Sequence, residues 1–195
     1  MLTIHGRATS LNVQAVMWTI AELGLTATRL DVGLNFGGTD TPEFRAMNPN
    51  GLVPVLQDGA VTMFESAAIN RYLAARHGRA SFWPEDPVAR APVDMWAEWG
   101  KTTLQTSFLR PVFWPTLEGA QPDAPQRAAF EKTLDIIETR LAGPWFLGAD
   151  FTLADIEIGL PLYRYYTCAL EERRERPAYA RHVVVNYDVL KSYKP

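Results

Sequence analysis

The sequence predicts an α/β N-terminal half followed by an all-α C-terminal half. Within 1–78, short β-branched runs alternate with amphipathic helical stretches in the order β-α-β-α-β-β-α. A proline-rich break follows at 79–88. Beyond it the patterns are helical, and strand signals return only in the tail. We therefore expect an α/β domain at 1–78, a linker at 79–88 and an all-helical domain at 89–195.

The first half opens with a strand and a helix. LTIH at 2–5 is a short β-run. Within 10–24, one helical face carries Val13, Val16, Met17 and Ile20. Ser10 or Asn12 can cap the start of this helix, and Gly24 can end it.

The rest of this half predicts a short helix, a hairpin and a longer helix. A strand at 27–32 leads into a Gly-rich loop, and 41–47 has the cap and proline order of a short helix. Two apolar runs joined by Asp58-Gly59 predict a β-hairpin. The last helix of this half covers 66–78.

Three helical stretches are expected in the second half. The first is long and is bent or stopped near Pro111. The second begins at Asp123, and the third begins at a capping box of Thr152 and Asp155 to which we assign a folding role. The tail at 182–195 fits neither helix nor strand clearly. The second helix carries an apolar stripe of Phe130, Leu134, Ile137 and Leu141.

Composition narrows the function. The 195 residues carry a formal net charge of -3, and the one arginine-rich stretch, EERRER at 171–176, alternates in sign. Nucleic acid and membranes are therefore not expected as partners, and no apolar run has the length of a membrane span. Cys168 is the single cysteine and the three histidines are scattered, so neither a disulfide nor a metal site is expected. Without a signal-peptide core, we expect a cytoplasmic protein.

Pro54 interrupts the apolar run in NPNGLVPVL at 48–56. Proline donates no hydrogen bond to a sheet, so it marks an edge, a strand start or a backbone with a special task. From the pattern alone an ordinary trans edge proline is the commoner case, because about 5–6% of X-Pro bonds are cis.

This order of elements resembles the thioredoxin-like fold, and the whole chain resembles a cytosolic glutathione S-transferase. The stretches that match are TSLNVQAVMWTIAELGL, TPEFRAMNPNGLVPVL, FESAAINRYLAARHG and FTLADIEIG. They resemble a bacterial branch of the family with a serine at the start of the first helix. The resemblance implies an enzyme that takes glutathione as co-substrate and a small hydrophobic electrophile. It also implies a homodimer, with Asn70, Arg71 and the start of VDMWAEW at 93–99 on the expected contact face.

The resemblance also implies how glutathione binds. It predicts that the Val53-Pro54 bond is cis. The backbone of Val53 can then pair with the cysteinyl unit of glutathione as with an added strand. Ser66, at a helix N-terminus, binds the γ-glutamyl carboxylate, and Glu65 holds the ammonium group. Without the family resemblance, the residues alone indicate that Ser66 is an N-cap and that Glu65 is an acidic residue that stabilises the start of the helix.

The glycyl end of glutathione has no evident charge partner. Members of the family often place a lysine, glutamine or histidine there, whereas this chain has Gly51 and Leu52. Phe36 is expected to cover that end by packing. The incomplete motif supports an alternative function, a non-catalytic binding or assembly module.

Ser10 is the candidate catalytic residue. A free thiol has a pKa near 8.5, so little of it is thiolate at neutral pH. A hydroxyl that donates a hydrogen bond to sulfur favours the thiolate, and so does a nearby helix N-terminus. Ser10 occupies the position of the family's serine, and Thr9 is the second choice. Asn12 either orients Ser10 in the glutathione site or caps the helix.

An electrophile pocket is predicted on the first helix of the second half. At helical spacing Trp99, Thr103, Thr106 and Arg110 fall along one line. This line mixes apolar, hydroxyl and cationic groups, whereas a core-facing side should be more uniformly apolar. Arg110 is expected to stabilise the negative charge that develops on the acceptor.

Overall fold

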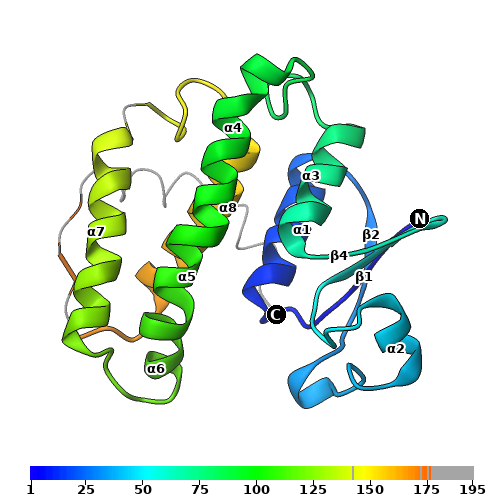
Figure 1. Cartoon of the computed structure of the whole chain (residues 1–195), viewed down its shortest axis with the longest axis horizontal. Helices are drawn as coiled ribbons and strands as arrows, with labels where there is room; N and C mark the ends of the chain where they lie inside the picture. Colours follow the sequence, from blue (N-terminus) through cyan, green and yellow to red (C-terminus); the bar gives the residue numbers. More distant parts are fainter. Residues whose placement is uncertain (142, 172, 175, 177–195) are drawn as a thin grey trace. The chain divides into compact units, whose positions relative to one another are not determined.

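The computed structural model describes residues 1–141, 143–171, 173, 174 and 176, and these form two compact units. Met1–Arg79 belong to the first unit, and the second begins at Ala80. Among the described residues, all strands lie in the first unit and the second is helical (Figure 1). The predicted fold class is thereby confirmed. The ambiguous tail at 182–195 lies outside the described residues.

The first unit is built on a four-stranded sheet with the order β2-β1-β3-β4. β1 runs parallel to β2 and antiparallel to β3, and β3 forms a hairpin with β4. The sheet is therefore mixed. The strands are β1 (Leu2–His5), β2 (Ala27–Leu30), β3 (Val55–Asp58) and β4 (Val61–Phe64).

Helices α1 (Leu11–Glu22) and α3 (Ser66–His77) pack against each other and cover the sheet (Figure 1). The short helices η1 (Leu34–Phe36) and α2 (Pro42–Met47) connect β2 to β3. Apolar residues at helical spacing on α1 and α3 meet alternate residues of β1 and β3, which makes one buried core. This core contains Leu2, Ile4, Val13, Val16, Ile20, Leu56, Ile69 and Leu73.

The first helical stretch of the second unit alternates between α- and π-helical turns. Pro111 lies in the second π segment, where the sequence predicts a bend or stop. Proline removes one i→i−4 hydrogen bond and its ring crowds the preceding turn, so a wider turn relieves the clash. The segments are α4 (Pro87–Trp99), η2 (Gly100–Leu104), α5 (Gln105–Phe108), η3 (Leu109–Phe113) and α6 (Trp114–Leu117).

Part of the proline-rich segment that precedes α4 is core rather than spacer. Phe82 and Trp83 are buried, and the backbone N–H of Leu153 donates to the carbonyl of Phe82 at 3.3 Å. α4 begins at Pro87, inside the stretch predicted as linker. The first helical position needs no N–H donor, so proline suits it, and Asp86 caps the helix.

The remaining helices are α7 (Ala124–Arg140) and α8 (Leu153–Thr167). Asp123 caps α7 by accepting from the N–H of Gln126 at 3.3 Å, and the predicted capping box begins α8. The predicted apolar stripe of α7 is buried throughout. None of the described helices is long and apolar enough to cross a membrane.

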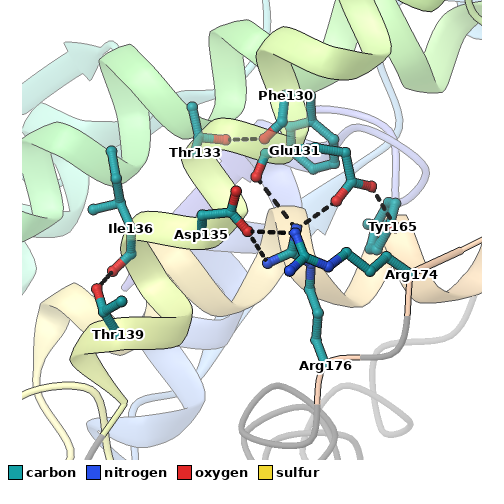
Figure 2. Close-up of polar contacts among 9 residues, drawn as sticks. All are labelled: Phe130, Glu131, Thr133, Asp135, Ile136, Thr139, Tyr165, Arg174 and Arg176. Carbon is teal, nitrogen blue, oxygen red and sulfur yellow. Dashed lines mark hydrogen bonds and ion pairs between the residues drawn. The ribbon is translucent and has the colours of Figure 1, made fainter.

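An ion-pair cluster fastens the segment after α8 to α7 (Figure 2). The buried side chain of Arg176 donates to Glu131 at 2.5 Å and to Asp135 at 2.8 Å. Arg174 donates to Asp135 at 3.0 Å, and the Tyr165 hydroxyl donates to Glu131 at 3.2 Å. These two arginines of the alternating-sign stretch therefore bind carboxylates of their own chain. No group of His, Cys, Asp and Glu in the described part of the chain is arranged to hold a metal ion.

Candidate active site

The register of the sheet gathers the predicted glutathione residues at one edge. Val55 pairs with His5 of β1 on one side and with Phe64 of β4 on the other. Because both pairings are antiparallel, the start of β3 lies beside the ends of β1 and β4. Val53 therefore stands between the loop that leads to α1 and the segment that leads to Ser66.

The Val53-Pro54 peptide bond is cis, as predicted. β3 begins only at Val55, so Pro54 lies just before the ladder, where no donor is required. The loop in front of it is held by Asn48, whose side-chain amide donates to the carbonyl of Leu52 at 2.7 Å. Pro54 is thus both the residue at the strand start and the cis proline that the resemblance implies.

Gly6 allows a close approach at the same edge. A Cβ at this position would lie 2.4 Å from a methyl group of Val13 and 3.2 Å from the Cβ of Val53. Val13 is fully buried in α1 and has no room to move aside. A glycine is therefore required for the end of β1 to pack against both α1 and Val53.

Ser10 is the N-cap of α1. Its hydroxyl oxygen accepts from the N–H of Val13 at 3.5 Å, a long bond, and its own N–H donates to the carbonyl of Arg7 at 3.1 Å. Accepting this bond leaves the hydroxyl proton available for a second partner. Asn12 lies inside the helix, so the interpretation of Asn12 as the cap is wrong. Thr9 is exposed.

Glu65 and Ser66 take different places from those of an ordinary cap. α3 begins at Ser66, so Glu65 is the cap residue, and its side chain makes no capping bond. The reading of Ser66 as a simple cap is therefore wrong. Glu65 has φ +69°, which costs a non-glycine residue about 1–3 kcal/mol. Such strain is common at ligand sites. The sequence does not predict it, because a positive φ is usually marked by a glycine and this residue is a glutamate.

The loop between β2 and α2 carries Phe36, predicted to cover the glycyl end of glutathione. The Phe36 side chain is 59% exposed. Leu52, which belongs to the NPNGLVPVL stretch, is 64% exposed. The N–H of Gly33 closes this loop by donating to the carbonyl of Gly37 at 2.7 Å. Phe36 therefore presents an aromatic surface to solvent from a closed loop of the first unit.

The residues predicted for the electrophile pocket do not share one environment. Trp99 is partly buried and packs edge-on against Trp96, with ring centroids 5.3 Å apart, at the rim of the second unit's core. Thr103, Thr106 and Arg110 are exposed. The π-helical turns of η2 and η3 change the angular spacing along this stretch, so a uniform helical line does not describe these four residues.

Two family models match the chain. The model described as the glutathione S-transferase N-terminal domain matches residues 2–75, and that of the C-terminal domain matches residues 67–183. Among curated proteins, the glutathione S-transferase GstB of Escherichia coli K12 is 32% identical over 207 residues, covering 95% of this chain and 99% of that protein. Glutathione S-transferase 3 of Zea mays is 34% identical over 164 residues, covering 79% and 73%.

Solved structures give the same result. The theta class glutathione S-transferase of Xanthomonas axonopodis pv. citri, solved with glutathione bound, is 37% identical with a TM-score of 0.85. The similarity covers 94% of this chain and 91% of that one. The Bombyx mori glutathione transferase BmGSTD1 is 26% identical with a TM-score of 0.88, covering 98% and 89%. The chain therefore belongs to the glutathione S-transferase family.

Proposed function

We propose that this chain activates glutathione as its thiolate through Ser10 and directs it at a small hydrophobic electrophile. The enzyme class, glutathione transferase, follows from membership of the family. The observation that carries the proposal is the sheet register, which brings the end of β1, Val53 and Ser66 to one edge. A serine at the start of α1 is what the bacterial serine-type branch of the family leads us to expect.

In this proposal glutathione lies along the edge as a short added strand. The backbone of Val53 pairs with the cysteinyl unit. The γ-glutamyl carboxylate binds at the N-terminus of α3, where the first N–H groups lack intrahelical acceptors and the helix dipole favours an anion. Glu65 receives the ammonium group. The strained backbone of Glu65 supports a task for this residue beyond joining β4 to α3.

Ser10 supplies the chemistry by donating its hydroxyl proton to the glutathione sulfur in a hydrogen bond. Lowering the thiol pKa by about two units needs roughly 2.7 kcal/mol of preferential binding to the thiolate. A charge-assisted hydrogen bond and the N-terminus of α1 together supply energy of this order. The thiolate then attacks the electrophile, and the electron pair leaves with the displaced group or enters the acceptor.

Arg110 is proposed to stabilise negative charge on the electrophile. Its guanidinium is exposed on η3 of the second unit, in a helical stretch that also presents Thr103 and Thr106 to solvent. Arg110→Leu is expected to change the ranking of kcat/KM among electrophiles by roughly three- to tenfold while the KM for glutathione stays within about twofold. Steady-state kinetics with a neutral and an anionic electrophile measure both quantities. A raised KM for glutathione with an unchanged ranking contradicts this assignment.

The function itself is tested by retention on a glutathione-affinity resin followed by turnover with an activated aryl halide. A transferase should be retained on the resin and should form the thioether of glutathione with the aryl group. The alternative, a non-catalytic module, is not favoured by relatives named as transferases. If the protein passes through the resin and forms no thioether, the non-catalytic module becomes the favoured function.

We also propose that the protein is cytoplasmic and that it forms a homodimer. A two-fold contact is expected for the dimer, because it is the commonest geometry of oligomers. The proposed contact face carries Asn70, Arg71 and the start of VDMWAEW, and the Asn70 side chain is fully buried in the single chain. Sedimentation at micromolar concentration tests the dimer, and a monomer there contradicts it.

A further inference from the structure

An asparagine followed by a glycine stands in the loop between α2 and β3. Asn50-Gly51 is the one Asn-Gly pair in the sequence. The backbone nitrogen of a glycine can approach the side-chain carbonyl carbon of a preceding asparagine closely, because no glycine side chain obstructs it. Attack at that carbon forms a five-membered succinimide ring and releases the amide nitrogen as ammonia. This pair therefore combines the two groups that react in a deamidation.

The fold requires the glycine of this pair. Gly51 has φ +63°, a conformation that residues with a side chain rarely adopt. A Cβ there would also lie 3.0 Å from the backbone carbonyl oxygen of Thr39. Any other residue at position 51 would thus be strained and crowded against the backbone. The amino acid at position 50 consequently decides whether this loop can deamidate.

The side-chain amide of Asn50 is not engaged by the fold. The residue is exposed, and within the part of the chain that the structure describes its amide group makes no hydrogen bond. Its backbone N–H, by contrast, donates to Oδ1 of Asn48 at 3.0 Å. Conversion of the amide into a carboxylate would therefore break no hydrogen bond that the structure records.

A hydrogen-bonded turn holds the attacking nitrogen. The N–H of Gly51 donates to the backbone carbonyl of Asn48 at 3.0 Å, which closes a β-turn with Pro49 at its second position. The buried side chain of Asn48 secures the turn by accepting from the N–H of Asn50 at 3.0 Å and donating to the carbonyl of Leu52 at 2.7 Å. The nitrogen must leave its acceptor before it can attack, so the reaction requires the turn to open.

A cation lies beside the reacting peptide. The guanidinium of Arg45 donates from Nη1 to the carbonyl of Pro49 at 2.9 Å. A Cβ at Gly51 would lie 3.2 Å from Nη2 of the same group, so the guanidinium also lies against Gly51. Positive charge at this place favours loss of the Gly51 N–H proton and stabilises the oxyanion that forms at the Asn50 side chain.

The chain carries a related pair whose side chain is held in place. Asp58-Gly59 lies at the turn between β3 and β4, and an aspartate before a glycine can form the same succinimide by losing water. The Asp58 carboxylate accepts from the Tyr72 hydroxyl at 2.9 Å and lies 3.3 Å from Nη1 of Arg76. These contacts restrain the carboxylate, and an ionised carboxylate is a poor target for a nucleophile. Asp58 therefore serves as an internal comparison for Asn50.

We propose that Asn50 is a site of spontaneous deamidation and that opening of the turn at Asn48 sets its rate. The Gly51 nitrogen gives its proton to solvent base and bonds to the side-chain carbonyl carbon of Asn50. The amide nitrogen takes up a proton from solvent and leaves as ammonia. Water then opens the succinimide at either carbonyl, which gives aspartate or isoaspartate. Either product adds one negative charge to the formal net charge of -3.

Isoaspartate also changes the backbone. The side-chain carbon enters the main chain, so the loop becomes one atom longer just before Val53 and the cis bond to Pro54. One consequence rests on the proposed function, in which the backbone of Val53 pairs with glutathione. The isoaspartate form binds glutathione more weakly, whereas the aspartate form keeps the length of the turn and binds it as the unmodified chain does.

The test follows the folded protein during incubation at mildly alkaline pH by peptide mapping, which separates asparagine, aspartate and isoaspartate forms. Modification is expected at Asn50, with none at Asp58 or at Asn35, an exposed asparagine that Phe36 follows. Asn48→Ala should raise the rate at Asn50 about tenfold, because the turn loses two hydrogen bonds. Asn50→Gln is the matched control. It keeps the amide on a side chain that is one methylene longer, which disfavours ring closure, so this variant should gain no charge on anion exchange.

The unfolded wild type supplies a second measurement. In urea the rate at Asn50 should exceed that of the folded wild type by about tenfold or more, because no turn holds the Gly51 nitrogen. This comparison decides the role of the turn even if Asn48→Ala does not fold, which thermal melting checks. Equal rates in the folded and unfolded wild type overturn control by the turn. An Asn50 that stays unmodified in the folded wild type and in folded Asn48→Ala overturns the site itself.

Glutathione kinetics test the consequence separately. The isoaspartate fraction of the incubated protein should show a KM for glutathione raised about threefold or more, while Asn50→Asp stays within about twofold of the wild type. Equal KM values in all three overturn the effect on binding. If the wild type neither binds nor uses glutathione, the proposed function fails, whereas the peptide maps still decide whether Asn50 deamidates.

Discussion

Ser10→Ala is expected to slow turnover of glutathione between about tenfold and a hundredfold at pH near 6.5, because the thiolate loses its hydrogen-bond donor. This range corresponds to a rise of about one to two units in the apparent pKa of the bound thiol. The defect should shrink as the pH rises above about 9, where the thiol ionises without help. Ultraviolet absorbance of the thiolate in the complex, followed against pH, measures this pKa directly.

The fold should survive this change. The capping bond to Val13 is 3.5 Å long, so its loss costs about 0.5–1 kcal/mol of stability. Asp86→Ala is the matched control, since it removes a shorter cap of 2.8 Å from α4 in the second unit and should leave turnover unchanged. An apparent pKa that does not move in Ser10→Ala removes Ser10 from the mechanism and points to Thr9 or a backbone N–H.

Asp155→Ala is expected to lower the free energy of unfolding by about 3 kcal/mol. The carboxylate accepts from the N–H of Phe146 at 2.7 Å, the N–H of Thr152 at 2.8 Å and the Thr152 hydroxyl at 2.9 Å. All three residues are buried, so removing the carboxylate leaves donors without acceptors, at about 1–3 kcal/mol each before relaxation. Urea unfolding measures the loss. Asp123→Ala, which removes an exposed cap of α7, should cost about 1 kcal/mol or less.

The contribution of Asp155 to the free energy of unfolding is expected to fall as the pH rises. Burial raises the pKa of Asp155 to about 6 in the native state, although the hydrogen bonds from Phe146 and Thr152 act in the opposite direction. The unfolded chain has a pKa near 3.8, so the native state binds more protons between these values. Stability from this group is therefore complete below about pH 4 and declines as the pH rises through about 6. The stability gap between wild type and Asp155→Asn should narrow over that range, and a gap that widens contradicts the raised pKa.

Features that depend on residues a few positions apart could be predicted from the sequence. The cap at Asp123, the capping box at Thr152 and Asp155 and the buried stripe of α7 all follow from local spacing, because a helix brings residues three and four apart together. The order of strands and helices likewise follows from local periodicity. The cis bond before Pro54 came from resemblance to a family, since the local pattern favoured trans.

Which residues meet at the sheet edge follows from the folded structure and could not be predicted from local patterns. Arg7 and Val53 are far apart in the sequence, yet both side chains lie beside Gly33, and no local pattern specifies that meeting. The strain at Glu65 has the same origin, because the surrounding fold imposes a conformation that glutamate does not prefer. Phe82 and Trp83 looked like linker residues and are core, since burial depends on what packs against a segment rather than on its prolines. The partner of a charge, the strain of a backbone and the burial of a loop are all properties of contacts, and contacts exist only after the chain has folded.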